Sequence, residues 1–354
     1  MEHKGKTRSL LIHHCQAYPK LGIQDVFKFL YQSAFGCEHL VSSAEAAAES
    51  IAKEYDGICR EDACTIEPLD GSYSRVSLSW LNHGLCADTF GKLFAASAKQ
   101  EANGWTNLLQ KLEAARELVR EGLLPFSQTE FEHAAAQWEK KGYPAIHHSE
   151  LFRVTYKPAY RVAANEYVPF LPLFAELDRR LAEGRVIAAV EGGSASGKTT
   201  LSHLLTGIYD CTVFHMDDFF LQPEQRTPER FAQTGGNIDW ERFLAEVLLP
   251  LRRGEVVNYR KFDCSTMRVG ECVQTVPKKL TVIEGAYSMH PELEQYYDFS
   301  AFLDISPQLQ TERILKRNAP QLAKRFFHEW VPLENVYFSQ TNIRQRCSLV
   351  IQVP

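Results

Sequence analysis

Residues 186–205 read VIAAVEGGSASGKTTLSHLL, and this stretch indicates how the second half of the chain folds. It begins with a short apolar run that stops at glycines, which is typical of a buried parallel strand. The residues after Gly197 favour a helix. Between strand and helix, Gly192-x-x-x-x-Gly197-Lys198-Thr199 matches the pattern of a phosphate-binding loop in its required setting.

The chemistry of such a loop follows from its residue types. Glycines let successive backbone N–H groups turn toward phosphate oxygens, and the helix N-terminus adds its positive end. Lys198 is expected to reach the β- and γ-phosphates, and the Thr199 hydroxyl to hold Mg²⁺. The sequence therefore predicts ATP and Mg²⁺ as cofactors, bound by Gly192, Gly193, Ser194, Ala195, Ser196, Gly197, Lys198, Thr199 and Thr200.

The rest of the second half alternates short apolar runs with helical patterns. Strands are expected at 211–216, 280–285 and 301–305, and an amphipathic helix at 239–252 with Asp239 as its cap. Ser306 and Pro307 open a further helix. This alternation predicts an α/β fold, a P-loop NTPase parallel sheet with helices on both faces, over residues 184–354.

Carboxylates follow two of the predicted strands. Asp217 ends the segment CTVFHMD, and Glu284 ends LTVIE. Ligands of parallel sheets bind beyond the carboxyl ends of the strands, so both side chains are expected near Lys198. There Asp217 can accept the proton of an attacking hydroxyl, and Glu284 can hold Mg²⁺ or its waters. Asp218 is expected on the other face of an extended segment.

Five segments carry a family resemblance: EGGSASGKTT, HMDDFF, NIDWERF, VIEGAY and ERILKRN. In order and spacing, residues 185–354 resemble the uridine kinase and phosphoribulokinase group of P-loop kinases. The resemblance implies that Asp217 is the catalytic base, that Asp239 binds hydroxyls of the acceptor and that Glu284 lies beside the metal. It also implies that Arg313 and Arg317 close over the phosphates as lid residues, a task suited to the guanidinium fork.

Two segments depart from the family pattern. Uridine kinases carry a Tyr-Asp-Phe segment followed by a histidine that contacts the base. Here NYRKFDCSTMR (258–268) has Tyr259, which we expect to bind substrate, and Phe262 and Asp263, but no histidine. The segment FFHEWVPLENVYF (326–338) has no counterpart in ordinary uridine kinases. The resemblance thus implies phosphoryl transfer from ATP more directly than it implies a nucleoside as the acceptor.

The first half, residues 1–183, is expected to be a mostly helical domain, and its role stays open. Helices are predicted at 23–35, 42–55, 105–124, 128–143 and 171–184. HHC (13–15), CEH (37–39), NHGLC (82–86) and HH (147–148) lack the paired spacing of zinc sites, so histidines and free thiols without metal are expected. LFRVTYKPAYRVA (151–163) alternates basic and aromatic residues. This pattern is compatible with contact to an anionic ligand or with a structural role at an edge of the fold, and we favour the structural role.

The composition limits the classes of partner. With a net charge of −5 and a pI of about 6.2, the chain has no excess of positive charge that would attract nucleic acid. It contains no long apolar run for a membrane span. Nine cysteines without a tight repeat suit a reducing cytoplasm. We expect a cytoplasmic protein with a small-molecule partner and neither nucleic acid nor membrane as partner; the oligomeric state stays open.

These observations favour an ATP-dependent kinase that phosphorylates a hydroxyl of a small metabolite, with a nucleoside as the leading acceptor. A sugar, sugar phosphate or vitamin precursor would suit the same chemistry. A third hypothesis is a nucleotide-gated binding or regulatory protein with little turnover. A general base at Asp217 favours the enzyme, because a sensor needs none.

Overall fold

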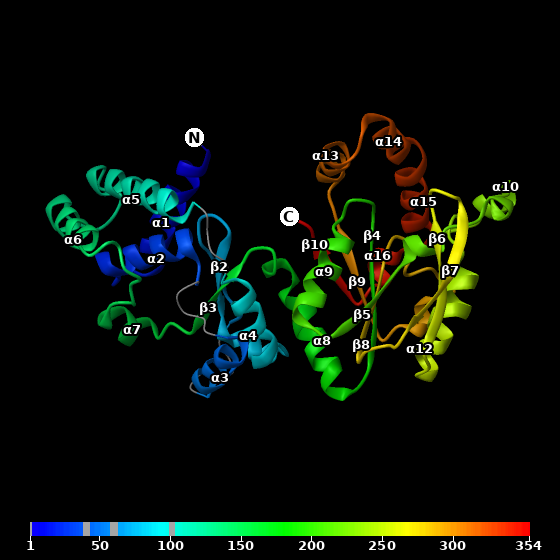
Figure 1. Cartoon of the computed structure of the whole chain (residues 1–354). Helices are drawn as coiled ribbons and strands as arrows, with labels where there is room; N and C mark the ends of the chain where they lie inside the picture. The colour runs from blue at the N-terminus through cyan, green and yellow to red at the C-terminus, as the bar shows by residue number, and fades with distance from the viewer. Residues whose placement is uncertain (1, 38–42, 57–62, 99–102) are drawn as a thin grey trace. The chain divides into compact units, whose positions relative to one another are not determined.

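The structure is a computed structural model, and it describes residues 2–37, 43–56, 63–98 and 103–354. The chain divides into two compact units, Met1–Leu171 and Pro172–Pro354. Figure 1 shows the helices and strands of each unit along the chain.

The second unit is built on a five-stranded sheet. Its strands are β4 (Val186–Gly192), β5 (Cys211–His215), β8 (Leu280–Glu284), β9 (Phe299–Asp304) and β10 (Leu349–Gln352). They lie in the order β10-β9-β4-β8-β5, and every neighbouring pair is parallel. The predicted parallel sheet is therefore confirmed, and β10 adds an edge strand that was not predicted from the sequence.

Helices cover this sheet on both faces, as expected. α8 (Leu171–Glu183) and α9 (Lys198–Ile208) lie on one side, and α12 (Leu249–Arg253) lies on the other (Figure 1). The remaining helices of this unit are α10 (Pro228–Phe231), α11 (Trp240–Phe243), α13 (Pro307–Arg317), α14 (Pro320–Arg325), α15 (Val331–Thr341) and α16 (Ile343–Arg346).

The helix predicted at 239–252 is present but changes its winding. α11 continues through a π-helical turn, Leu244–Leu248, into α12. Pro250 explains the change, because it has no N–H for the helical ladder and its ring would strike the preceding turn. Asp239 caps the helix as expected, with Oδ1 accepting from the Arg242 N–H at 3.1 Å. Phe243, Val247 and Leu248 on its apolar stripe are fully buried.

An antiparallel hairpin adjoins the sheet in the second unit. It is formed by β6 (Val257–Asp263) and β7 (Arg268–Thr275), with an irregularity between Arg260 and Phe262. The departure from the family pattern around Tyr259 thus lies on a strand, whose inward residues Val257, Tyr259 and Phe262 are buried.

Helix α8 belongs to the second unit by its contacts. The Tyr209 hydroxyl lies 2.9 Å from Asp178 Oδ1, and Arg180 Nη1 donates to the Asp298 carbonyl at 2.6 Å. The boundary between the two compact units therefore falls at Leu171 in the chain, whereas the apolar pattern of the sequence suggests a boundary near residue 184.

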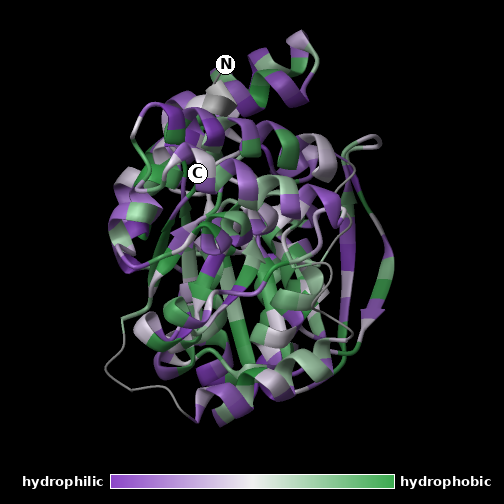
Figure 2. Cartoon of the chain, turned by 90° about the vertical axis from the view of Figure 1, so that its left-hand side faces the viewer, coloured by the Kyte–Doolittle hydropathy of each residue, from purple (hydrophilic) through white to green (hydrophobic). Residues whose placement is uncertain are grey.

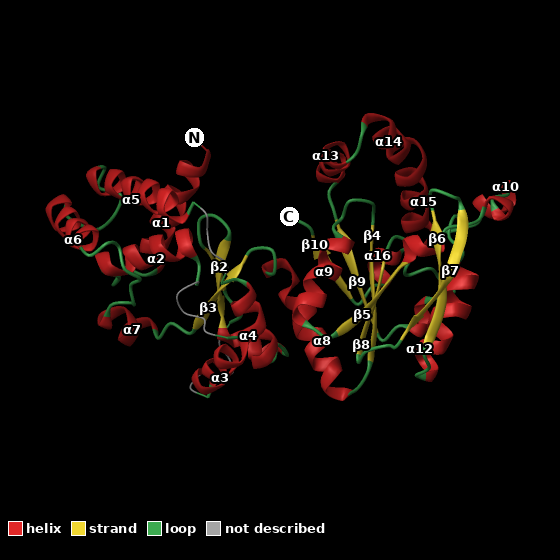
Figure 3. Cartoon of the chain, viewed as in Figure 1, coloured by secondary structure: helices red, strands yellow, loops and turns green. Residues whose placement is uncertain are grey.

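The first unit is mostly helical, as predicted (Figure 3). Its helices are α1 (Glu2–Ala17), α2 (Ile23–Phe35), α3 (Ala44–Tyr55), α4 (Ala87–Ala96), α5 (Gly104–Arg120), α6 (Gln128–Lys140) and α7 (Glu150–Tyr156). Phe27 of α2 stacks on Trp138 of α6 with ring centroids 4.7 Å apart, inside one large apolar cluster. Many helices carry both hydrophobic and hydrophilic residues, as helices packed on a core do (Figure 2).

A small antiparallel sheet accompanies these helices. It comprises β1 (Ile66–Pro68), β2 (Tyr73–Ser77) and β3 (Tyr160–Ala164), with β2 in the centre. It was not predicted from the sequence, because its strands have three to five residues and the central one buries an arginine, Arg75. β3 is an edge strand and includes part of the basic and aromatic stretch 151–163.

None of the helices in the described part of the chain is long and apolar enough to cross a membrane.

Candidate active site

The glycine-rich loop joins β4 to α9 as the sequence predicts. Gly192 has a φ of 152°, and a β-carbon there would lie 2.8 Å from the Leu303 carbonyl oxygen, so only glycine fits. Gly197 begins α9 in a left-handed conformation, with a φ of 98°. The loop is thereby wrapped around the N-terminus of α9, where backbone N–H groups favour an anion.

Side chains of the loop make specific contacts. Lys198 Nζ donates to the carbonyls of Gly192 and Gly193 at 2.8 and 3.0 Å. The Ser196 hydroxyl is buried and has no hydrogen-bond partner among the described residues. Thr199 and Thr200 lie on the first turn of α9, and both are exposed. The loop thus offers an ammonium and hydroxyls around one backbone cradle.

Glu284 lies at the end of β8, beside this loop. Its Oε1 accepts from the Thr199 hydroxyl at 3.1 Å and lies 2.6 Å from His215 Nδ1. Burial raises the pKa of the Glu284 carboxyl, but His215, Lys198 and Thr199 outweigh this and leave it lowered. The contact with Glu284 raises the pKa of His215. A carboxylate is thus held in charged form at the sheet edge.

Asp217 follows β5, the neighbour of β8. The strand ends at His215, and residues Met216–Phe219 form a 3₁₀ turn rather than the extended segment expected from the sequence. Asp217 reaches solvent, yet the walls around it desolvate the carboxyl and raise its pKa. Glu284 adds to this shift, while the positive charges of Lys198 and His215 oppose it. The pKa of Asp217 therefore depends on charged groups of both the loop and β8.

Asp218 has a different environment. Its Oδ2 lies 3.2 Å from Lys261 Nζ on β6, and its carbonyl accepts from Arg242 Nη2 at 2.9 Å. Asp218 thus connects the turn to the β6–β7 hairpin, whereas Asp217 interacts electrostatically with Lys198 of the loop.

The residues expected to bind the acceptor are both buried. Asp239 accepts from the Arg242 N–H and, through Oδ2, from Gln225 Nε2 at 3.1 Å. Tyr259 packs against Phe214 and Phe219, with ring centroids 5.2 and 6.0 Å away. Their contacts support the shape of the turn that carries Asp217 and Asp218.

Both predicted lid arginines lie on α13. Arg313 Nη1 approaches the Ala195 carbonyl of the loop at 3.4 Å, and Nη2 donates to the Pro354 carbonyl at 2.9 Å. The guanidinium of Arg317 lies over the ring of Phe326, 5.7 Å from its centroid. Arg313 is thus brought to the phosphate loop, whereas Arg317 packs against the next helical segment.

Two residues of this site were not among the predicted ones. His215 stands two residues before Asp217, a spacing that could have indicated a shared edge of the strand. Glu334 of α15 enters the loop itself: Oε2 accepts from the Ser194 N–H at 2.8 Å, and Oε1 from its hydroxyl at 2.6 Å. No local sequence signal connects Glu334 with a loop 140 residues away.

Thr199 and Glu284 fit a magnesium ion by their chemistry. A hydroxyl and a carboxylate oxygen 3.1 Å apart are the hard oxygen donors that Mg²⁺ prefers, and Mg²⁺ takes few protein ligands beside substrate phosphates and water.

The histidines and cysteines of the first unit form no metal site where they are described. Across residues 2–37, 43–56, 63–98 and 103–354, no three His, Cys, Asp or Glu side chains gather as metal ligands. Cys15 and Cys37 are buried free thiols, and His14 and His148 bind carboxylates. Glu38 and His39 of CEH lie outside the described residues.

Part of the second unit matches a known protein family. Residues 186–322 match the model of the Phosphoribulokinase / Uridine kinase family, which confirms the resemblance stated for the second half. No curated protein matches the sequence.

Several solved structures resemble about half of this chain. A possible uridine kinase from Bacillus stearothermophilus is 20% identical over 50% of this chain and 99% of its own, with a TM-score of 0.37. A candidate fructose transport system kinase from a Silicibacter species is 21% identical over 47% and 89%, with a TM-score of 0.39. Shikimate kinase from Bacteroides thetaiotaomicron is 15% identical over 48% and 86%, with a TM-score of 0.23.

Proposed function

We propose that the unit matched by the phosphoribulokinase and uridine kinase family transfers the γ-phosphoryl group of ATP to a hydroxyl of a small metabolite. One observation carries this proposal. A phosphate loop, an acid held in charged form at Glu284 and a carboxyl of raised pKa at Asp217 lie at the ends of the adjacent strands β4, β8 and β5. A protein that only binds ATP has no need of Asp217 as a base.

In this proposal the loop and Lys198 bind the phosphates. The N–H groups at the start of α9 meet the phosphate oxygens, and the ammonium leaves the Gly192 and Gly193 carbonyls to stabilise charge on the transferred group. Arg313, already at the Ala195 carbonyl, adds positive charge from α13. Arg317 would need to turn away from Phe326 to join it.

Asp217 accepts the proton of the acceptor hydroxyl. Its raised pKa brings the carboxylate closer in basicity to the group that it must deprotonate, which favours general-base catalysis. Lys198 and His215 oppose this rise in the pKa of Asp217, which favours the ionised form of the base.

Magnesium would be held by Thr199 and Glu284. When bound, it supplies positive charge that neutralises the phosphate oxygens during transfer. His215 Nδ1 lies 2.6 Å from the same Oε1 of Glu284 that accepts from Thr199, and this contact helps to orient the carboxylate.

A nucleoside is the leading acceptor, and support for it comes from the family resemblance. That resemblance implies that Asp239 binds acceptor hydroxyls, although both of its oxygens accept hydrogen bonds from the protein here. The histidine that contacts the base in uridine kinases is missing after Tyr259. A sugar, sugar phosphate or vitamin precursor is therefore the second class of acceptor. We also propose that the protein acts in a reducing cytoplasm, since no disulfide joins cysteines in the part of the chain that the structure describes.

The test is ADP production by the purified chain with Mg²⁺ and ATP against a panel of nucleosides, sugars and pantothenate-like alcohols. Turnover stimulated by one acceptor and lost in both Lys198→Ala and Asp217→Asn would support the kinase and name its substrate. ATP binding without stimulation by any acceptor would favour a nucleotide-gated binding protein instead.

A further inference from the structure

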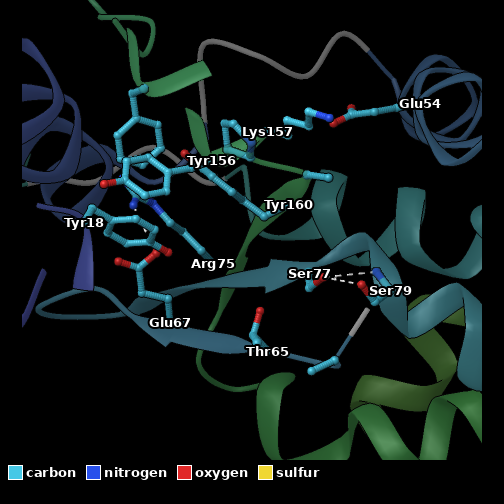
Figure 4. Close-up of a pocket in the computed structure, with 14 residues that line it drawn as sticks. Tyr18, Glu54, Thr65, Glu67, Arg75, Ser77, Ser79, Tyr156, Lys157 and Tyr160 are labelled. Carbon is cyan, nitrogen blue, oxygen red and sulfur yellow. Dashed lines mark hydrogen bonds and ion pairs between the residues drawn. The ribbon is translucent and has the colours of Figure 1, made fainter. Parts of the chain in front are cut away.

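The first unit contains a cavity of about 720 Å³, within the usual size range of small-molecule sites. It lies between the small sheet, the segment after α1 and helix α7 (Figure 4). Tyr156, Lys157 and Tyr160 in its wall come from the basic and aromatic stretch 151–163 that the kinase proposal does not use.

Arg75 is the central charged group of this wall. Its side chain is 2% exposed, and its guanidinium lies between the rings of Tyr160 and Phe29, 4.9 and 5.6 Å from their centroids. Nε donates to Gln32 Oε1 at 2.9 Å, and Nη1 donates to Glu67 Oε2 at 3.1 Å. Nη2 is buried and has no partner in the part of the chain that the structure describes. A buried charged donor without an acceptor costs free energy. Arg75 Nη2 can therefore still donate a hydrogen bond to an oxyanion.

The negative charges near Arg75 are already compensated. Glu67 Oε1 lies 2.6 Å from His14 Nδ1, and Oε2 accepts from Arg75. Burial would raise the pKa of Glu67, but Arg75 and His14 hold it at about 2. Glu54 at the cavity rim forms an ion pair with Arg161 at 2.8 Å. Neither carboxylate therefore opposes an anionic ligand with its full charge.

A second cavity of about 430 Å³ shares Glu54, Pro158 and Tyr160 with the first. Burial lowers the pKa of Lys28 in its wall to about 8, with a further contribution from Arg75. Five basic residues and two carboxylates line the two cavities together: Lys28, Arg75, Arg153, Lys157 and Arg161 against Glu54 and Glu67. The excess of positive charge favours an anion.

Aromatic rings supply the apolar part of the first cavity. Tyr18 meets Tyr156 edge-on at 5.0 Å and Phe152 at 5.1 Å, and Tyr160 faces the same space. Rings in this arrangement offer both faces and edges to a planar ligand. Hydroxyls of Thr65, Ser77 and Ser79 line another part of the wall (Figure 4).

We propose that the first unit binds a small metabolite in which a carboxylate or phosphate group is attached to a planar aromatic body, with the oxyanion on Arg75 and the ring among Tyr18, Tyr156 and Tyr160. This site is distinct from the phosphate loop, and its existence does not depend on the kinase proposal.

The experiment is calorimetric titration of the full chain with naphthoate, naphthyl phosphate and uncharged naphthamide. We expect at least one anion to bind about tenfold or more tightly than naphthamide, because a charged hydrogen bond to Arg75 is gained. The anion that binds more tightly identifies a carboxylate or a phosphate as the natural group. In Arg75→Lys, which keeps a charge beside Glu67 but loses the fork, this preference should disappear.

Further variants separate recognition from folding. Tyr156→Ala, at a half-buried position of the wall, should weaken all three probes, while Lys140→Gln on α6 serves as a matched surface control. Thermal unfolding of each variant checks that it is folded. Lys198→Ala should leave binding unchanged. The proposal is overturned if no probe binds, if naphthamide binds as well as the anions, if the preference survives in folded Arg75→Lys, or if Lys198→Ala abolishes binding.

Discussion

The carboxylate of Glu334 lies inside the phosphate loop, where it accepts both the backbone N–H and the hydroxyl of Ser194, at 2.8 and 2.6 Å. Burial raises the pKa of Glu334, and Lys198 opposes this shift. A negative side chain thus occupies a donor of the loop that is proposed to bind the phosphates of ATP.

Glu334→Gln keeps the shape of the side chain and removes its charge. We expect the KM for ATP to fall by about threefold to tenfold, because repulsion between a carboxylate and phosphate is lost. Steady-state kinetics with varied ATP measure this, with Glu329→Gln as control, since Glu329 is paired with Arg325 at 3.0 Å on an exposed surface. A higher KM would mean that Glu334 supports the binding shape of the loop.

Asp217→Asn should lower kcat by about 10²–10⁴-fold, because the proposed base can no longer accept a proton. ATP affinity should change by less than about threefold, given that Asp217 contacts the acceptor rather than the phosphates in the proposal. Coupled ADP assays and equilibrium ATP binding measure the two quantities. Asp218→Asn, which weakens the contact with Lys261, should lose far less activity; equal losses would argue against Asp217 as the base.

The pH profile tests the environment of Asp217. Its pKa is raised above 3.8 by desolvation, so kcat/KM should fall as pH decreases through that raised pKa and protonates the base. In His215→Asn a neighbouring positive charge is lost, and that charge lowers the pKa of Asp217. The acid limb should therefore move to higher pH in the variant. If the acid limb of the kcat/KM profile does not move in His215→Asn, a group other than Asp217 causes it.

Stability of the first unit should depend on pH through His148. This buried histidine lies 3.0 Å from Asp25 Oδ1 and 2.7 Å from the Tyr160 hydroxyl, and burial lowers its pKa to about 4. The unfolded chain binds a proton near pH 6.5, so stability is complete above that pH and is lost as pH falls toward 4. The loss should be on the order of 2–3 kcal/mol.

Hydrogen exchange in α2 and α7 as a function of pH measures this loss. His148→Asn retains a donor toward Asp25 without titrating, and should therefore flatten the dependence between pH 6.5 and 4. His147→Asn, at an adjacent and more exposed position, provides the matched control. If the stability of His148→Asn depends on pH as steeply as that of the parent chain, His148 is not the source of the dependence.

Gly285 follows Glu284 with a φ of 147°, and a β-carbon there would lie 2.5 Å from Met216 Cβ. Gly285→Ala should destabilise the second unit by about 2 kcal/mol or more and displace the turn that carries Asp217. Chemical denaturation and activity measure both effects. Gly207→Ala, inside α9 with open space around it, should be neutral or stabilising by about 0.5–1 kcal/mol.

Much of the second unit was predictable because its signals are local. The strand β4, the loop and the helix α9 are adjacent in sequence, and the apolar runs of β5, β8 and β9 are continuous. Parallel strands bring their carboxyl ends to one edge, so the sequence alone was enough to expect Asp217 and Glu284 near Lys198. The 3₁₀ turn at Met216–Phe219 was not predicted, because the buried contacts of Phe219 with Phe243 and Tyr259 decide it.

The phosphate loop and the order of the acids that follow it could be predicted because each is encoded by a short run of consecutive residues. The residues that face them could not be predicted, because they come from distant parts of the chain. Glu334 reaches Ser194 across 140 residues, and His215 meets Glu284 across 69. In the first unit, Arg75 is enclosed by residues of α2, β1 and β3. Such contacts depend on how distant segments pack, and no periodicity or spacing in the sequence records them.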